Sequence, residues 1–282
     1  MRRRGLMFGL LGLALYLVFL VAMAPAAWVS WAVVRASHGV VNIDRPAGTL
    51  WQGHGHLVIH LASSAPQSLG LVSWEIRPLW IFAGQLRART GLQGPGTDVR
   101  AELGVGYRRY FLADVAATFP AQILGSLYSP AALLGPAGAF HIAARRLDLA
   151  GSNLTGNATV EWRQAASSLS SVRPLGDYRL YLQGHGRNVA LRVQTLDGSL
   201  GINGSGTWEP ASGQIRFGGT AKPAANQAAL EPVLRMFGPD RGNGMRMIDW
   251  QWNTGPMALH HVSARMYSAF CRGAGRDGKR GA

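Results

Sequence analysis

The sequence predicts a mainly β protein: one N-terminal transmembrane helix, then an antiparallel, glycine-rich β domain with two short helices. Short apolar runs with a period near two follow one another along most of the chain, and turn residues separate them. Closely spaced short strands without long helices between them are typical of antiparallel meanders. The chain also has 37 glycines among 282 residues, which disfavours a helical bundle because each interior glycine costs about 1 kcal/mol there.

Composition and charge limit the functional classes. Hydrophobic residues make up 48% of the chain, enough for a substantial core, whereas charged residues make up 15%. The net charge is +14, and apart from Lys222 and Lys279 the basic residues are arginines. They form no dense basic run outside the two ends of the chain, which favours attraction to anionic lipid headgroups over sequence-specific nucleic-acid binding. The lone Cys271 excludes an internal disulfide and a cysteine-based zinc site.

The N-terminal segment predicts an inner-membrane anchor. Arg2, Arg3 and Arg4 precede an apolar run from Gly5 to Ala27. A spanning helix needs about 20 apolar residues, which this run supplies. Because positive residues stay on the cytoplasmic side, the expected topology is single-pass, with residues 1–4 cytoplasmic and the bulk of the chain periplasmic.

The anchor has a predicted membrane interface, and a cleaved signal peptide is the alternative interpretation of the same segment. Residues 5–34 are expected to hold the signal-anchor and its interface, where Trp28 and Trp31 take positions usual for interfacial aromatics. A cleaved signal peptide is the alternative, with Ala22-Met23-Ala24 or Ala24-Pro25-Ala26 as its cleavage box. The apolar run is longer than a usual signal-peptide core, which favours an uncleaved anchor.

The periplasmic domain is expected over residues 35–261, followed by a disordered Arg/Gly-rich tail over 262–282. Two helical stretches are expected, at Pro120–Leu127 and Asn226–Phe237, because a helix-starting Pro or Asn opens each of them. The predicted strands share alternating apolar residues bounded by Gly, Pro or Asn. They cover residues 48–61, 71–76, 84–90, 99–105, 110–117, 140–149, 154–162, 178–183, 189–195, 199–208, 213–220 and 246–252.

A weak internal repeat divides the domain. Residues 50–57 share a frame with residues 154–160 and 202–208: an apolar residue, Gly or Ala two and four places later, then an apolar or aromatic residue. Glycines two apart lie on one face of a strand and let an aromatic side chain, another sheet or a lipid chain come close. Two related lobes are therefore expected, about 40–118 and 138–252, joined by a linker over 119–137. One continuous curved sheet is the alternative.

Several segments, taken in their order along the chain, resemble one known family. They are Gly48-Thr49-Leu50-Trp51-Gln52-Gly53, Trp74-Glu75-Ile76-Arg77-Pro78 followed by Gly84-Gln85-Leu86, Leu175-Gly176-Asp177-Tyr178-Arg179-Leu180, and Gly198-Ser199-Leu200-Gly201-Ile202-Asn203-Gly204-Ser205-Gly206-Thr207-Trp208. Together, from the anchor to about Trp252, the chain resembles protein N of the type II secretion system, also called the general secretion pathway.

The resemblance implies a Gram-negative inner-membrane protein with a periplasmic β domain, accessory to the machine that exports folded proteins. Its partners would be other type II secretion subunits of the inner-membrane platform or its link to the outer-membrane pore, together with the phospholipid bilayer. No catalytic motif is carried over from the family. The alternative is an AsmA-like envelope protein whose Gly-x-Leu-x-Gly repeats build a lipid-accommodating β groove.

Neither catalysis nor a cofactor is expected. The sequence lacks the usual nucleophile-elbow, phosphate-loop, dinucleotide and zinc-protease motifs, and its carboxylates are scattered. His54, His56 and His60 could face a metal from one side of a strand, but no carboxylate or thiol nearby completes a ligand set. We therefore expect exposed polar histidines and no metal. Ser205, between two glycines, is expected inside a strand rather than at a nucleophilic turn.

Two candidate contact sites remain. Trp250 and Trp252 alternate with Asp249 and Gln251, so they share one face of what is expected to be the last strand. At a sheet edge this face could dock a partner by strand addition, although core packing explains most tryptophans in strands. Gly5, Gly9 and Gly12 lie three or four residues apart and could pack the anchor against another helix, or simply reflect the usual small residues of spanning helices.

Overall fold

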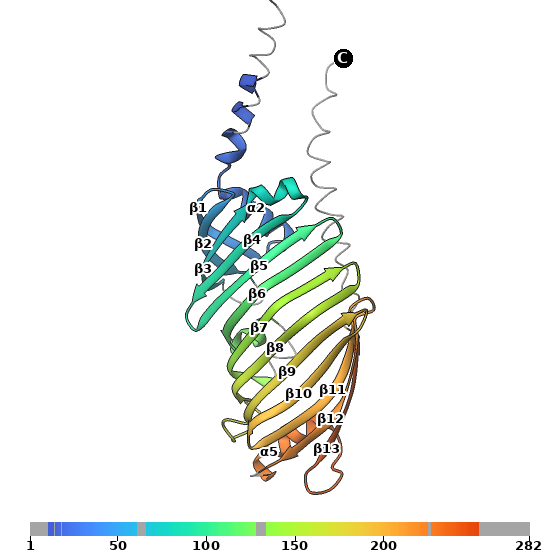
Figure 1. Ribbon diagram of the computed structural model, residues 1–282. Coiled ribbons are helices and arrows are strands. Elements are labelled where there is room, and N and C mark those ends of the chain that lie inside the picture. The colour runs from blue at the N-terminus through green and yellow to red at the C-terminus, as the bar shows by residue number, and fades with distance from the viewer. Residues whose placement is uncertain are drawn as a thin grey trace, which may run out of the picture. The chain divides into compact units, whose positions relative to one another are not determined.

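The computed structural model describes residues 11–13, 15–17, 19–60, 66–127, 134–224 and 227–253. In this part of the chain thirteen strands follow one another in chain order, from β1 to β13 (Figure 1). The pairings from β1 to β6 and from β8 to β13 are antiparallel. The prediction of a mainly antiparallel β protein is therefore confirmed.

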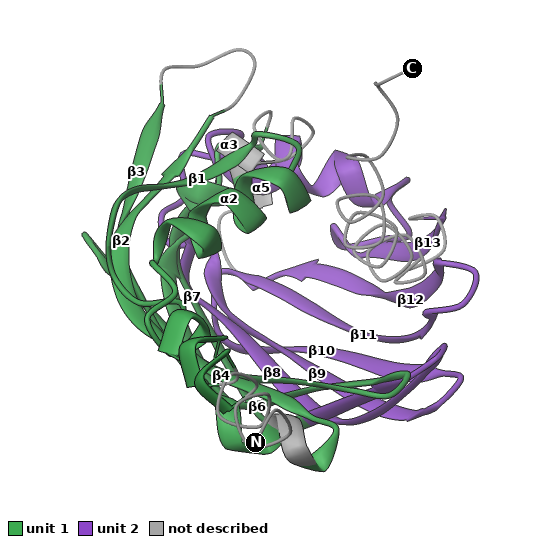
Figure 2. Cartoon of the chain, turned by 90° about the horizontal axis from the view of Figure 1, so that it is seen from above, with its two compact units in different colours: residues 1–146 green, residues 147–282 purple. Residues whose placement is uncertain are grey.

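The chain divides into two compact units, residues 1–146 and 147–282 (Figure 2). In unit 1 the elements are α2 (Ala27–Ala36), β1 (Val41–Gly48), β2 (Gln52–Ile59), β3 (Gln67–Arg77), η1 (Pro78–Ala83), β4 (Leu86–Gly94), β5 (Thr97–Gly106), β6 (Arg109–Pro120) and α3 (Gln122–Leu127). The division between the units falls within β7 (Ala137–Ala150). Unit 2 holds β8 (Asn153–Ala166), β9 (Gly176–Gly186), β10 (Val189–Gly198), β11 (Leu200–Glu209), β12 (Gln214–Pro223), α5 (Gln227–Leu234), η2 (Arg235–Phe237) and β13 (Arg246–Asn253).

β1 is not among the strands predicted from the sequence, because its residues do not alternate regularly between apolar and polar. It contains Pro46 and several polar residues, and its register with β2 shifts between Asp44 and Ala47. Arg45 adopts a φ of 49° in this bulge. β1 is also the first strand in the sheet order, and such edge positions tolerate proline because the missing N–H faces no partner strand.

Unit 1 has a small core between α2 and the first strands. Ala26, Ile43 and Trp74 are buried there, and Val29 and Val33 of α2 pack against them. The Ser30 hydroxyl donates a hydrogen bond of 2.9 Å to the Ile43 carbonyl oxygen, which holds the helix on β1. Trp28 and Trp31 point away from this core and are 56% and 65% exposed. The helix thus buries its aliphatic residues and leaves both tryptophans exposed.

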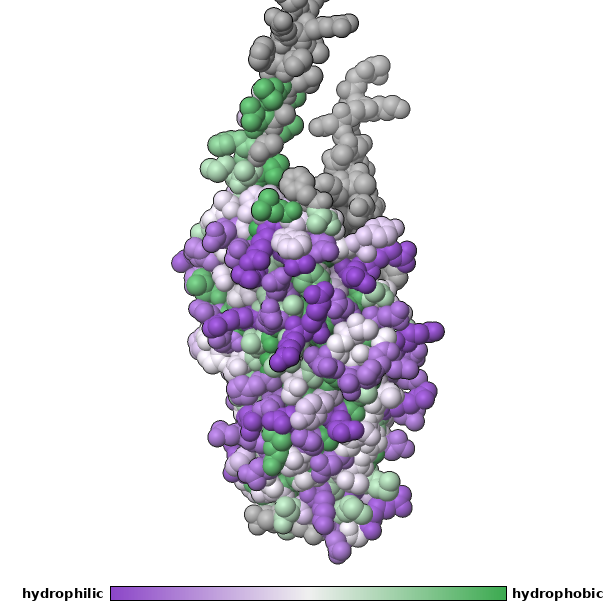
Figure 3. Space-filling model, viewed as in Figure 1, coloured by the Kyte–Doolittle hydropathy of each residue, from purple (hydrophilic) through white to green (hydrophobic). Residues whose placement is uncertain are grey.

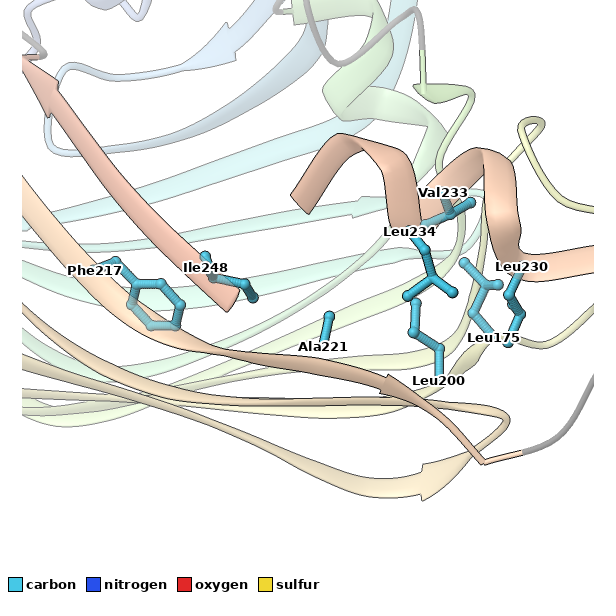
Figure 4. Packing of buried hydrophobic residues seen from close by; sticks show 8 residues of the cluster. All are labelled: Leu175, Leu200, Phe217, Ala221, Leu230, Val233, Leu234 and Ile248. Atoms are coloured by element: carbon cyan, nitrogen blue, oxygen red, sulfur yellow. The ribbon is translucent and has the colours of Figure 1, made fainter. Parts of the chain in front are cut away.

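Unit 2 has the larger core, in which α5 covers one face of the sheet. Figure 4 shows Leu230 and Leu234 of α5 pointing toward Leu175 and Leu200, and Val233 belongs to the same buried cluster. Their buried neighbours on or beside the strands are Leu175, Leu200, Phe217, Ala221 and Ile248. Since a fully buried leucine contributes about 1.5 to 3 kcal/mol, this cluster is the main hydrophobic support of unit 2.

Aromatic rings lie over two glycines of the repeats, Gly53 and Gly206. Gly53 pairs across β2 and β3 with Trp74, and a Cβ on Gly53 would lie 2.5 Å from the Trp74 ring. Gly206 pairs in the same way with Phe217 across β11 and β12, and a Cβ there would lie 3.1 Å from the ring. At Gly53 and Gly206 the close approach expected from the Gly-rich frame is therefore made by an aromatic side chain together with backbone atoms of the neighbouring strands, whereas at Gly55 it is made by Ile43 of β1.

The N-terminal apolar run does not continue as one helix into unit 1. The described residues from 11 to 22 are helical, Met23 to Ala26 form a break, and α2 begins at Ala27. Within the described ranges, no helix combines the length and apolar character required for crossing a bilayer. Residues 1–10, which include Arg2, Arg3, Arg4, Gly5 and Gly9, lie outside the described residues, as does the tail over 262–282.

Candidate interaction surfaces

The turn between β1 and β2 is where the N-terminal helical segment joins unit 1. Gly48 adopts a φ of 95°, which favours glycine, and lets the chain reverse. The Leu50 amide donates to the Ala24 carbonyl oxygen at 2.7 Å, and Pro25 forms a bridge with Thr49. Ala24 is 3% exposed, so the break in the apolar run is packed into the unit.

Trp51 makes further contacts at the joint, the place where the N-terminal helical segment meets the β1–β2 turn. Its indole Nε1 donates to the Val21 carbonyl oxygen at 2.9 Å, and its own carbonyl oxygen accepts the Ile76 amide at 2.6 Å. The first of the segments that carry the family resemblance, Gly48–Gly53, thus has a structural purpose: it binds the end of the N-terminal helix. A cavity of about 440 Å³ lies beside it, lined by residues that include Trp51, Ile76, Leu79 and Trp80.

The edge strand β13 carries the predicted tryptophan pair. Arg246 and Ile248 are buried on the face that packs against the unit 2 core, and Met247 and Asp249 are exposed on the other. Trp250 shares the buried face and stacks on Phe237 with ring centroids 5.4 Å apart. Trp252 follows it at 5.0 Å between centroids but is 51% exposed. The two tryptophans lie side by side, with only Trp250 packed into the unit.

A buried arginine joins β13 to α5. The Arg246 side chain is 7% exposed, and its Nη2 lies 3.0 Å and 3.1 Å from the two carboxylate oxygens of Glu231. Asp240 lies 3.6 Å away, and the Gly238 carbonyl oxygen accepts a further hydrogen bond of 3.2 Å. This ion pair holds α5, the helix that covers the core, against β13. Sequence reasoning missed it because the two residues stand on separate elements.

The 175–180 segment is also structural. The Asp177 carboxylate accepts the Gln164 amide at 2.7 Å, at a bulge where Gln164 has a φ of 49°. This hydrogen bond, together with the Arg163 guanidinium at 3.0 Å, holds the pKa of Asp177 below its usual range. Burial raises the pKa of Tyr178, whose hydroxyl donates to the Leu200 carbonyl oxygen at 2.8 Å. The segment stabilises the packing of β8, β9 and β11.

The remaining candidates show no assembled chemistry. His54 and His56 are exposed on β2, and His60 is exposed just after it. In the parts of the chain that the structure covers, no group of three or more metal-ligating side chains comes together. Ser205 lies within β11, opposite Gly218. A Cβ on Gly12 would meet nothing within 4 Å, so that position is open in the single chain.

The short helix η1 is an exposed apolar feature that sequence reasoning passed over. Leu79 is 78% exposed and Trp80 is 37% exposed. The run Leu79-Trp80-Ile81-Phe82, which directly follows Pro78, has no alternation and fits no strand of the series. Such an unbroken apolar run after a proline is the signal that could have identified it.

The comparisons with known proteins give one match. The family profile for type II secretion system (T2SS) protein N matches residues 40–249, a range that includes strands of both units. No curated protein and no solved structure matches the chain. All four segments that suggested this family lie within the matched range. The chain therefore belongs to the type II secretion system protein N family.

Proposed function

We propose that the chain is a non-enzymatic accessory component of the type II secretion system, anchored in the inner membrane. It assists assembly or stabilisation of the envelope-spanning machine by binding other secretion subunits through its periplasmic β domain. The family match over residues 40–249 carries this proposal. Residues of the segments that carry the resemblance, such as Trp51 and Asp177, make structural contacts within the chain.

Contacts at the N-terminal joint support an uncleaved anchor. Ala24 and Ala26 belong to the two cleavage boxes considered for a signal peptide, and they are only 3% and 2% exposed. Ala26 donates its amide to the Gly48 carbonyl oxygen at 3.2 Å, and Ala24 accepts the Leu50 amide. Cleavage at either box would remove residues that pack in unit 1. With Arg2, Arg3 and Arg4 in the cytoplasm, both β units would be periplasmic.

The function is tested by one purification from native membranes. The full-length protein is extracted after brief cross-linking, and co-purifying proteins and lipids are identified together. Secretion-platform or pore subunits are expected, with the protein retaining its own N-terminus and resisting a carbonate wash. Stoichiometric phospholipid without any secretion subunit would overturn the proposal in favour of a lipid-carrying β groove. A mature chain that begins near Ala27 would overturn the anchor.

The exposed end of β13 is the proposed partner surface, and its two tryptophans should respond differently. Trp252→Ser should reduce recovery of the cross-linked secretion partner about tenfold without lowering the thermal midpoint, because an exposed interfacial tryptophan can contribute more than 1 kcal/mol of binding. Trp250→Ser is the matched control: it removes the stack on Phe237 and should lower the midpoint by several degrees. Unchanged partner recovery with Trp252→Ser would exclude this surface.

The glycines of the anchor are proposed as a second contact, within the membrane. Gly5, Gly9 and Gly12 would let another helix approach closely. Unchanged association of the Gly9→Leu variant in the same cross-linking assay would show that they only reflect the usual composition of spanning helices.

A further inference from the structure

The end of unit 1 that holds the β1–β2 turn is fixed next to the N-terminal helical segment. Val21 is bound by Trp51, and Ala24 by Leu50, so the helix leaves the unit at this turn. Figure 3 shows that the described part of this helix is strongly hydrophobic, whereas much of the visible surface below it is hydrophilic. If the helix is inserted in a bilayer, as the proposed function holds, the membrane surface lies close to Trp51.

Exposed apolar side chains lie at the same end. Trp80 and Leu79 of η1 line one cavity with Trp51, which places η1 beside the joint. Figure 1 shows the short teal coil of η1 at the end of the unit from which the helical segment leaves. Leu79 exposes 78% of its surface there, next to the partly exposed Trp80, so the apolar surface is contiguous.

The turn between β5 and β6 adds an aromatic residue and two basic ones. A Cβ on Gly106 would lie 3.7 Å from the Gln85 side chain and 3.8 Å from the Gly84 carbonyl oxygen, so this turn adjoins the end of η1. Tyr107 is 89% exposed, and Arg108 and Arg109 beside it are exposed as well.

The charges at this end are mainly basic. Among the described residues, no ion pair joins Arg108 or Arg109 to a carboxylate. Arg87 lies with its guanidinium carbon 3.6 Å from the centroid of the Trp80 ring, and it also approaches Glu102 at 3.8 Å. Glu75 lies nearby, where Arg77 pairs with it at 3.6 Å.

We propose that Leu79, Trp80, Tyr107, Arg108 and Arg109 form a docking surface that rests on the anionic phospholipid bilayer beside the anchor. Leucine and the aromatic rings enter the headgroup region, where amphipathic rings are favoured, and the two arginines meet lipid phosphates. The proposal rests on the proposed inner-membrane anchoring for its orientation. It adds a second contact between unit 1 and the membrane, beside the helix that Trp51 and Leu50 already bind.

The test places a single label on this surface in the full-length protein. Cys271→Ser removes the only native thiol, and Leu79→Cys or Leu71→Cys then introduces one labelling site. Leu71 is the matched control: it is a leucine in unit 1 with 40% exposure, and it lies about 20 Å before the end of β3 that leads into η1. Both proteins are reconstituted in phosphatidylglycerol-containing vesicles, and the fluorophore is quenched by lipids that carry a quencher near the headgroup.

We expect quenching at residue 79 to exceed that at residue 71 by about twofold or more, and Arg108→Gln with Arg109→Gln to reduce the difference. Vesicles of pure phosphatidylcholine should also show a smaller difference than anionic vesicles, since they carry no net negative charge. Equal quenching at both positions in protein that resists a carbonate wash would overturn the docking surface while leaving the anchor intact. Release of the protein by the wash would instead overturn the anchoring, and the docking proposal with it.

Discussion

Replacing Glu231 with alanine is expected to lower the free energy of unfolding of unit 2 by about 2 to 4 kcal/mol. The substitution leaves the guanidinium of Arg246, which is 7% exposed, without its bidentate partner. Among the residues that the structure describes, Asp240 at 3.6 Å and the Gly238 carbonyl oxygen are then the acceptors that remain beside it. An uncompensated buried charge is expensive because little water reaches it. Thermal unfolding of the full-length protein in detergent, followed by circular dichroism, measures the loss.

A control for this prediction lies on the same carboxylate. Arg235 also approaches Glu231, at 3.3 Å, but its side chain is 75% exposed. Arg235→Ala should therefore change stability by less than about 0.5 kcal/mol. Combining Glu231→Ala with Arg246→Met should recover most of the loss, since the buried charge is removed along with its partner. Equal effects of Glu231→Ala and Arg235→Ala would contradict the importance of the buried pair.

The sequence predicts the secondary structure of this protein better than its strand register and side-chain packing. The antiparallel class and most of the strands follow from alternation and turn residues, which act locally. β1 was missed because Pro46 and the bulge at Arg45 break the alternation, and only pairing with β2 makes this segment a strand. The sequence predicted that another group would approach the repeat glycines closely, but it could not identify the side chains that lie over Gly53 and Gly206. Their partners become known only once strand register is fixed.

The candidate surfaces, too, could be predicted only in part from the sequence. Alternation correctly places Trp250 and Trp252 on one face, but it could not separate the packed ring from the exposed one, because Phe237 arrives from η2. The docking end of unit 1 depends on three segments far apart in the chain: Trp51, Leu79–Trp80 and Tyr107–Arg109. None of these segments defines a surface alone. What makes them one surface is that the start of β2 and the ends of β3 and β5 lie beside the same η1 helix.

Gly206→Ala is expected to destabilise unit 2 by about 1 to 3 kcal/mol, although it adds only one methyl group. The added Cβ would overlap the Arg216 carbonyl oxygen and lie 3.0 Å from the Phe217 Cα. Both are backbone atoms of the paired strand β12, so they can move only if the two strands separate. A flexible side chain would have turned aside at little cost.

Gly218→Ala is the matched control on the neighbouring strand, because the nearest atom to its Cβ is the Ile248 carbonyl oxygen at 3.9 Å. That variant should be neutral or slightly stabilising, by up to about 1 kcal/mol, since alanine restricts the unfolded chain more than glycine does. Opposite signs of the two stability changes would distinguish a glycine that close backbone packing requires from one that it does not require. If both variants lost equal stability, the close approach of the β12 backbone would not be the reason for glycine at position 206.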